Sequence, residues 1–304
     1  MLAVADRLAN KAMQRTAVQR SKSPSLVMPM APQLLTDQHP TASVDTSVDI
    51  SHLVIEDDKP VDNFQSAQQQ RFLVQTLYDS QALPVPFLAE ANVGLFYQLK
   101  EDPIVPDVLL SLGVQRGDDY SQRENRSYFV WELGKLPELC IEIVSNQEGD
   151  EVDLSRKSKR KGKTFTKKDR YSEIGVQYYV VFDPLEQIQA DMGYAKVKVW
   201  TCSPDDSGYS ETLAQSINEI GQYVWLDRIG VGLTLWRGEF EENVTRVWLR
   251  WCDIDGNVIL TGAERARLAD RRADDSDRRA NSAEAKAQRL ADRLRELGLN
   301  PDEL

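Results

Sequence analysis

Two acidic residues interrupt apolar segments of this sequence, and a lysine-rich segment follows the second one. Asp107 lies within VPDVLLSL, and Glu142 lies within LCIEIVS. A carboxylate in an otherwise apolar strand must be paired with a cation, protonated or bound to a metal, because burying an isolated charge costs too much free energy. Carboxylate oxygens suit a hard cation such as Mg²⁺, which polarises phosphate groups and activates water. The two acids and the adjacent lysines therefore predict metal-assisted phosphate chemistry.

The lysine-rich segment runs from Arg156 to Arg170 and contains nine basic residues and one acid, which gives it a local charge of +8. The whole chain carries a charge of −11, so this segment is a positive patch on an acidic protein. Such a patch can bind phosphates without making the whole protein bind polyanions. A solvated loop is the other interpretation of a charge run, but the closeness to Glu142 favours phosphate binding. We expect nucleic-acid contacts from Lys159, Arg160, Lys161, Lys163 and Lys168.

Other residue types argue against several kinds of site. The two histidines, His39 and His52, lie in a polar N-terminal region outside any expected core. Their position argues against a Ser-His-Asp triad, an HNH nuclease or a His-ligated zinc centre. The three cysteines are far apart and form no CxxC pair, so we interpret them as small hydrophobic residues. No segment is apolar over enough residues to span a membrane, and charged residues interrupt the N-terminus early; we expect a cytoplasmic protein.

A strand–helix–strand unit is the expected frame of the site. Three short apolar runs, rich in β-branched or aromatic residues, predict buried strands: residues 105–112 with Asp107, residues 139–145 with Glu142, and residues 178–182. The long connection between the last two accommodates a helix at residues 166–174 that ends at Gly175. Within this helix Lys167 and Tyr171 are four residues apart, so they share one face.

The remaining pattern divides the chain into three parts. Residues 1–62 have a disorder-like composition rich in Ser, Pro, Thr, Asp and Gln, and we interpret them as a tail. Residues 63–262 predict one folded domain, and residues 263–304 predict a helical arm. Within the domain we expect a helix at 63–77 and further strands at 93–99, 128–133, 196–201, 223–226, 233–236 and 247–251.

Residues 263–297 are dense in alanine, arginine and acidic residues. A heptad register fits them, with positions alternately three and four residues apart: Ala266, Ala269, Ala273, Ser276, Ala280, Ala283, Ala287, Leu290, Leu294 and Leu297. An alanine seam lets two helices approach closely but buries little apolar area. A paired coiled coil, which would make the protein a homodimer, and a single solvated helix are both compatible with this pattern, and we favour pairing. Gly298 and Pro301 predict the helix end.

Several of these features occur together in one order along the chain. They are Pro106-Asp107, the strand from Glu142 to Ser145, and the pattern Tyr171…Gly175-Val176…Tyr178-Tyr179…Asp183-Pro184. In this order they resemble the Uma-two family of restriction endonucleases, which belongs to the PD-(D/E)xK superfamily. The resemblance covers roughly residues 63–203. It implies an α/β fold, with a restriction-endonuclease-like core of a mixed β-sheet flanked by helices, to which the long C-terminal α-helix is added.

The resemblance also implies a set of site residues. Asp107 and Glu142 would hold Mg²⁺ or Mn²⁺, and a lysine would orient or deprotonate the attacking water. The superfamily pattern puts this lysine two residues after the second acid, where this chain has Val144. The following helix supplies the expected replacement, Lys167, with Lys163 and Lys168 as alternatives.

Each of these residues also has a structural interpretation. Asp107 could cap the start of a strand, and Glu142 could form a structural ion pair. Tyr171 and Tyr178 could belong to the core, and Asp183-Pro184 could end a strand with a turn. A Gly-Glu-Leu motif that many family members carry is not found here, and Glu90 is a weaker candidate for an additional acid.

The expected function is hydrolysis of DNA phosphodiester bonds by a magnesium-dependent endonuclease. The alternatives are an inactive nuclease-like scaffold that acts through its C-terminal coiled coil, and a DNA-binding module that does not cleave. The missing strand lysine favours the alternatives, whereas the two acids and the basic segment favour the enzyme. An enzyme requires the carboxylates of Asp107 and Glu142 on one face of the sheet, and opposite faces would exclude this function.

Overall fold

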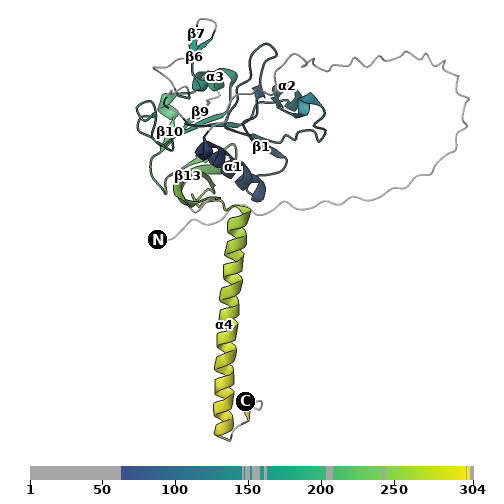
Figure 1. Cartoon of the computed structure of the whole chain (residues 1–304), viewed down its shortest axis with the longest axis vertical. Coiled ribbons are helices and arrows are strands. Elements are labelled where there is room, and N and C mark those ends of the chain that lie inside the picture. Colours follow the sequence, from purple (N-terminus) through teal and green to yellow (C-terminus); the bar gives the residue numbers. More distant parts are fainter. Residues whose placement is uncertain are drawn as a thin grey trace, which may run out of the picture. The chain divides into compact units, whose positions relative to one another are not determined.

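The computed structural model describes residues 63–145, 147, 151–152, 158–160, 163–202, 208–241, 244–298 and 300–301, and of residues 158–160, 163 and 164 it describes the backbone. All of these residues belong to one unit of the chain, Asp49–Leu304, and Figure 1 labels several of its helices and strands. The predicted tail at residues 1–62 and the predicted DNA contact Lys161 lie outside the described residues.

A mixed sheet forms the centre of the described fold. Its six strands follow the order β1-β3-β5-β8-β9-β10. The middle strands, β5 (Leu139–Ile143) and β8 (Tyr178–Phe182), are parallel, and the other pairs are antiparallel. The flanking strands are β1 (Phe87–Ala91), β3 (Val108–Leu112), β9 (Val197–Thr201) and β10 (Gln215–Ile217). The helix α3 (Lys167–Ile174) lies in the connection between β5 and β8, which confirms the predicted strand–helix–strand unit.

Side chains alternate along the strands, so both faces of the sheet are buried. On β5, Ile141 and Ile143 join one apolar cluster with residues of α1 (Phe64–Asp79). Cys140 joins a second apolar cluster with Tyr171 of α3. Helices therefore supply apolar side chains to both faces, which explains why β5 and β8 are continuous apolar runs rather than alternating ones.

The helix α1 confirms the predicted helix near residues 63–77 and joins the main sheet to a second one. Its first turn is capped by Asn63, whose side chain accepts a hydrogen bond from the Ser66 N–H at 3.0 Å. The Gln69 side chain bonds both the N–H and the C=O of Leu249. Leu249 lies in the three-stranded antiparallel sheet of β11 (Tyr223–Leu226), β12 (Val231–Glu239) and β13 (Thr245–Cys252).

Two predicted strands are wrong in extent. Of residues 93–99, β2 contains only Leu95–Phe96, and it pairs in parallel with β4 (Tyr128–Phe129). The rest of the predicted strand 128–133 is a single helical turn, α2 (Val130–Leu133), which ends at Gly134 with φ +74. Glycine adopts this left-handed conformation without strain, so the turn can stop there.

Four strands were not predicted: β1, β6, β7 and β10. β1 is only five residues long and has Glu90 at its fourth position, so its sequence FLAEA gives a weak strand signal. β6 (Ser158–Arg160) and β7 (Lys163–Phe165) form an antiparallel hairpin within the basic segment. Their many lysines and arginines obscure the strand pattern, because lysine is depleted in strands.

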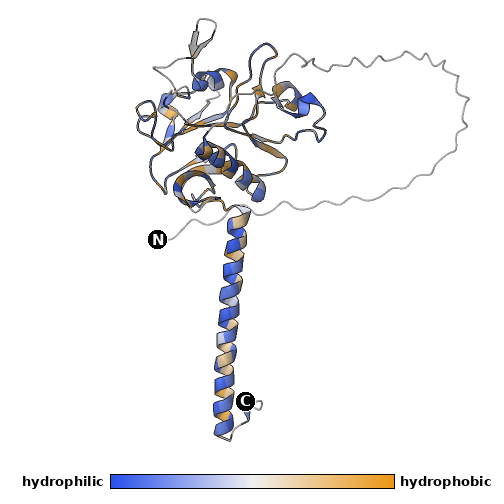
Figure 2. Cartoon of the chain, viewed as in Figure 1, coloured by the Kyte–Doolittle hydropathy of each residue, from blue (hydrophilic) through white to orange (hydrophobic). Residues whose placement is uncertain are grey.

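The C-terminal helix α4 (Gly262–Glu296) matches the predicted helix at 263–297. It starts with a capping box, in which Thr261 accepts from the Glu264 N–H and the Glu264 carboxylate accepts from the Thr261 N–H. None of its residues is buried, and Figure 2 shows hydrophilic residues along its whole length with apolar patches between them. Gly298 follows with φ +76, as predicted for the helix end. Pairing of this helix stays a prediction.

The N-terminal end of α4 is attached to the core through Arg250 of β13. The Arg250 side chain is buried and donates two hydrogen bonds to the Glu264 carboxylate, at 2.8 and 2.6 Å. Its guanidinium group also lies 4.6 Å from the ring centroids of both Phe72 and Trp236.

Among the helices of the described residues, none combines the length and the apolar character that crossing a membrane requires.

Candidate active site

The end of the β3–β5 ladder brings the two predicted acids close together. Val108 pairs with Ile141 as the last pair of this antiparallel ladder, so Asp107 and Glu142 are the next residues along the two chains. Asp107 Oδ2 accepts a hydrogen bond of 2.5 Å from the Ile143 N–H, which holds its carboxylate against β5. Asp107 thus lies one residue before β3, rather than within the strand as predicted, and beside the strand that carries Glu142.

Glu142 is fully buried and accepts hydrogen bonds from two side chains of α3. Lys167 Nζ lies 2.6 Å from Glu142 Oε2, and the Tyr171 hydroxyl donates to Glu142 Oε1 at 2.9 Å. A capping box between Thr166 and Asp169 starts α3 and makes Lys167 its first residue. The predicted common face of Lys167 and Tyr171 is therefore confirmed, and this face points at Glu142.

Gln70 and Asn92 also belong to the surroundings of Asp107. Gln70 of α1 donates from Nε2 to Asp107 Oδ1 at 3.0 Å, and its own Oε1 accepts from Asn92 Nδ2 at 2.7 Å. Asn92 follows β1 and has φ +53, a conformation that asparagine tolerates better than most residues. Neither residue was predicted, because an amide on an amphipathic helix or in a loop has no distinctive sequence signal.

The charges in this site are set by burial and by the two acids. Desolvation lowers the pKa of Lys167, but the charges of Glu142 and Asp107 and the hydrogen bond to Glu142 outweigh it, so this pKa is raised. Burial and then the charge of Glu142 raise the pKa of Tyr171. Lys167 is therefore a cation and Tyr171 a neutral donor at neutral pH. The Lys167 side chain keeps 37% of its surface exposed, whereas Glu142 keeps none.

The donor set fits Mg²⁺ or Mn²⁺. Asp107 and Glu142 offer oxygen donors, which hard cations prefer. The ammonium group of Lys167 beside Glu142 shows that this position accommodates a cation. In the part of the chain that the structure describes, no group of three or more His, Cys, Asp and Glu side chains could hold a metal ion. Two carboxylates would thus leave other coordination positions to water and phosphate oxygens, as is usual for Mg²⁺.

The other predicted lysines are distributed over two places. Lys168 contacts Glu211 at 2.6 Å, whereas Lys167 is the lysine of this pair that contacts Glu142. Lys159 and Arg160 lie on β6, and Lys163 starts β7. The structure describes the backbone of these three residues, so their predicted contacts with DNA stay predictions.

The weaker candidates have structural partners. Glu90 forms an ion pair with Arg116. Asp183 accepts hydrogen bonds from the N–H groups of Gln187 and Ile188 at 2.9 Å, which confirms the turn that ends β8. The Tyr178 hydroxyl pairs with Asp227.

The cysteines match the prediction of small hydrophobic residues only in part. Cys140 and Cys252 are buried and Cys202 is half-buried, and all three are thiols rather than halves of a disulfide. Burial raises the pKa of the Cys140 thiol well above its ordinary value. A thiol in this state is a poor nucleophile and a poor metal ligand.

Comparison with known proteins agrees with the fold. The family model Uma2, described as "Putative restriction endonuclease", matches residues 52–237. This range is more than half of the 304 residues and contains Asp107, Glu142 and Lys167. No curated protein matches the chain. The family match covers more than half of the chain, and the mixed sheet flanked by helices agrees with it. The chain therefore belongs to the Uma2 family of putative restriction endonucleases.

Proposed function

We propose that this protein is a metal-dependent endonuclease that hydrolyses phosphodiester bonds of DNA. The closeness of Asp107 and Glu142 at the end of the β3–β5 ladder carries the proposal, with the Lys167 ammonium group 2.6 Å from Glu142. This arrangement combines two hard oxygen ligands with a fixed positive charge at the edge that solvent reaches. Phosphodiester hydrolysis needs both, because negative charge develops on the phosphate oxygens.

The two acids would hold the ion, and the neighbouring residues would orient the acids. Bound Mg²⁺ or Mn²⁺ would polarise the phosphate and make water a stronger nucleophile. The Ile143 N–H and Gln70 fix both oxygens of Asp107, and the Tyr171 hydroxyl orients Glu142. Such fixed donors preserve the ligand geometry between turnovers.

Lys167 would act beside the bound ion. Without the ion, Glu142 and Asp107 raise its pKa, so it carries a charge that can stabilise the charge developing on the phosphate. A bound Mg²⁺ or Mn²⁺ would neutralise the same two acids and lower the pKa of Lys167 again. The proposed role therefore includes orienting or deprotonating the attacking water, as expected from the sequence.

DNA is the proposed partner, and the protein is proposed to act in the cytoplasm as a homodimer. The hairpin of β6 and β7 precedes Lys167 in the chain, so basic residues of this hairpin, among them Lys159, Arg160 and Lys163, would contact DNA phosphates near the site. One site cuts one strand of DNA, so cutting both strands requires two sites. Pairing through α4 would supply the second site.

Dimerisation has a direct test in the leucines near the end of α4. Leu290 is 66% exposed, so aspartate at this position leaves the fold of a monomer intact. We expect Leu290→Asp with Leu294→Asp to weaken the dimer in sedimentation experiments. A wild-type chain that stays monomeric at tens of micromolar, where a pair of about −6 to −7 kcal/mol associates, contradicts the dimer.

A DNA-binding module without cleavage is the second candidate. The oxygens of Asp107 and Glu142 already accept hydrogen bonds from Ile143, Gln70, Lys167 and Tyr171, as they would in a purely structural ion-pair network. This candidate predicts salt-sensitive DNA binding that survives Asp107→Ala, without cleavage by the wild type.

Plasmid nicking separates the two candidates. Wild-type protein is incubated with supercoiled plasmid in Mg²⁺, in Mn²⁺ and in EDTA, beside the variants Asp107→Asn and Glu142→Gln. We expect cleavage with either metal, none in EDTA, and a loss of about 100-fold or more in both variants.

The matched control is Glu138→Gln, because Glu138 also accepts a hydrogen bond from the backbone N–H of a neighbouring strand, at Leu112. Its activity should stay within about threefold of the wild type, as expected for an acid without a catalytic role. Cleavage that persists undiminished in Glu142→Gln contradicts the assignment of the site.

A further inference from the structure

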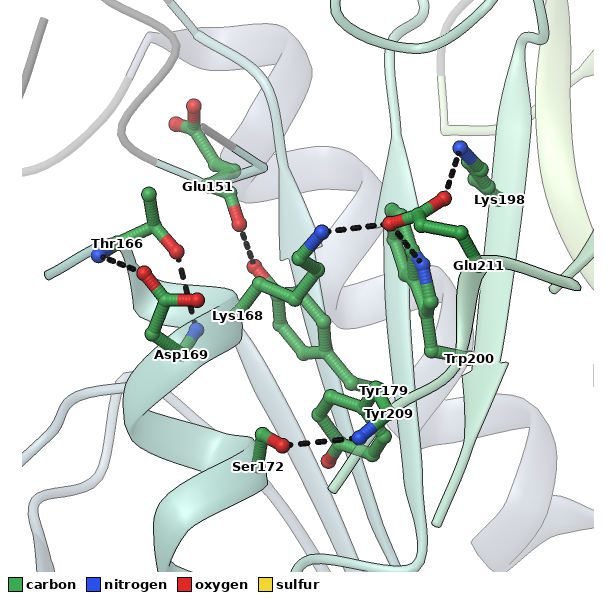
Figure 3. Close-up of polar contacts among 10 residues, drawn as sticks. All are labelled: Glu151, Thr166, Lys168, Asp169, Ser172, Tyr179, Lys198, Trp200, Tyr209 and Glu211. Carbon is green, nitrogen blue, oxygen red and sulfur yellow. Dashed lines mark hydrogen bonds and ion pairs between the residues drawn. The ribbon is translucent and has the colours of Figure 1, made fainter. Parts of the chain in front are cut away.

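Beside the candidate active site, four side chains form a second polar cluster (Figure 3). Glu211 accepts hydrogen bonds from Lys168 Nζ at 2.6 Å, from Lys198 Nζ at 2.8 Å and from the Trp200 indole N–H at 2.9 Å. The three donors come from α3 and β9, and Glu211 comes from the single turn η2 (Glu211–Leu213). Two ammonium groups and one indole N–H thus converge on one anionic group.

This cluster lies in the same row of the sheet as the candidate active site. Glu142 of β5 pairs with Val181 of β8, and Val181 pairs with Lys198 of β9. Directly paired residues share a face, so Glu142 and Lys198 point to the same side of the sheet. Two spacings between neighbouring strands separate them by about 10 Å. Along the axis of duplex DNA, this distance corresponds to the rise of about three base pairs.

The donors are held in place by contacts that do not involve Glu211. The ammonium groups of Lys168 and Lys198 lie 5.2 and 5.0 Å from the centroid of the Trp200 ring, distances at which a cation is attracted to an aromatic face. The Trp200 side chain is fully buried. Glu211 is the most exposed member of the cluster, at 54%, against 18% for Lys168 and 16% for Lys198. It can turn into solvent while the three donors stay together.

We propose that Lys168, Lys198 and the Trp200 indole N–H form a second phosphate-binding site, which takes a backbone phosphate of the same DNA whose cleavage is proposed above, and that Glu211 occupies this site when DNA is absent. A phosphodiester group carries one negative charge and accepts hydrogen bonds, as a carboxylate does, so it can replace Glu211 on the same donors. The proposal rests on the proposed function for the identity of its ligand.

The charges of the cluster agree with this role. Desolvation raises the pKa of Glu211, but the hydrogen bonds from Lys168 and Lys198 outweigh it and lower this pKa to about 2. Two lysines against one carboxylate leave the cluster with an excess of one positive charge. When Glu211 turns away, both positive charges are available to a phosphate.

Equilibrium binding of the full chain to a short fluorescent DNA duplex in EDTA tests the proposal, because cleavage is suppressed. Removing the competing carboxylate by Glu211→Gln should tighten binding by about threefold, the effect expected of one exposed ion pair. Lys198→Ala and Lys168→Ala should weaken binding and reduce the slope of log K against log salt by about 0.9, the value for one phosphate contact.

The matched controls come from a second exposed ion pair beside β9. Lys196 and Glu186 contact each other, and Glu186→Gln and Lys196→Ala change the net charge of the chain by the same amounts. They should leave the binding constant and the salt slope within the error of the wild type. If Glu211→Gln equals Glu186→Gln, or if Lys198→Ala equals Lys196→Ala, the second phosphate site is refuted.

A double-mutant comparison excludes a purely structural effect of Glu211. Glu211→Gln should tighten DNA binding in the wild type and have no effect in the background Lys168→Ala with Lys198→Ala. Tightening that persists in this background overturns the proposal.

The phosphate site and the proposed nuclease function can be refuted independently of each other. Binding changes without any plasmid cleavage support the phosphate site and contradict the nuclease. Cleavage without these binding changes supports the nuclease and contradicts the phosphate site.

Discussion

Two adjacent lysines, Lys167 and Lys168, form ion pairs that differ in almost every physical property. Lys167 binds Glu142, whose side chain is fully buried and belongs to a central strand. Lys168 binds Glu211, whose side chain is 54% exposed and belongs to a single helical turn. In both pairs the nitrogen and oxygen lie 2.6 Å apart, so the distance alone does not distinguish them.

The difference shows that the environment of the carboxylate decides what an ion pair can do. Glu142 cannot move into water, so its partner must come to it, whether that partner is an ammonium group or a metal ion. Glu211 can move into water at small cost, so another anion can take its place. The two neighbours on α3 therefore suit the two different roles proposed for them: Lys167 beside a fixed centre for cations, and Lys168 in a replaceable contact for anions.

The largest effect that would sharpen this comparison concerns cleavage. Lys167→Met removes the charge beside the acids and should lower plasmid cleavage by about 100-fold or more, the scale of a lost charge-stabilising group. Lys168→Met should lower it by about tenfold or less, because only one phosphate contact is lost. Cleavage rates at saturating metal measure both. Equal losses in the two variants would break the distinction between the lysines.

A smaller effect is expected in stability. Glu142→Ala leaves the Tyr171 hydroxyl buried without its acceptor and should lower the free energy of unfolding by about 1–3 kcal/mol. Glu211→Ala removes an exposed partner and should cost less than about 1 kcal/mol. Urea unfolding at neutral pH, monitored by circular dichroism, gives both values. A larger loss for Glu211→Ala would show that Glu211 is a structural element rather than a replaceable one.

The smallest effect is a dependence on pH. The pKa of Glu211 is lowered in the folded protein from 4.5 to about 2. A depressed carboxyl pKa contributes stability above the unfolded pKa and loses it as the pH falls through the folded one. The stability difference between wild type and Glu211→Gln should thus be present at pH 7 and disappear between pH 4.5 and about 2. We expect this stability difference to be less than about 1 kcal/mol at pH 7, since solvent screens the ion pairs of Glu211. A stability difference that does not change with pH would contradict the lowered pKa of Glu211.

The sequence was sufficient to predict the parts of the fold that rest on local patterns. Buried strands at β5 and β8 are dense in β-branched and aromatic residues, and Thr166 with Gly175 marks both ends of α3. Once these elements are known, the spacing of Lys167 and Tyr171 gives their common face. Asp107 and Glu142 were recognisable because an acid in an apolar run is chemically conspicuous.

Features that depend on contacts between distant segments could not be predicted. Gln70 reaches Asp107 from 37 residues away, and Glu211 reaches Lys168 from 43 residues away. Neither residue differs in its local sequence from an ordinary polar surface residue. Their partners are fixed by the strand order of the sheet, which a single sequence does not reveal.

The hydrogen bond from the Ile143 N–H to Asp107 has a consequence for how this protein can evolve. Asp107 occupies the place of a strand partner, since it satisfies a buried backbone donor next to the end of the β3–β5 ladder. Its loss would leave that donor unsatisfied, so selection for a stable fold would retain Asp107 even in a descendant without the proposed DNA cleavage. The charges of Glu142 and Lys167 are constrained less strictly, because glutamine at position 142 would still accept the hydrogen bond from the buried Tyr171 hydroxyl without needing the Lys167 ammonium group. Among descendants of this chain, conservation of both charges would therefore indicate the proposed activity, whereas conservation of Asp107 would indicate only the fold.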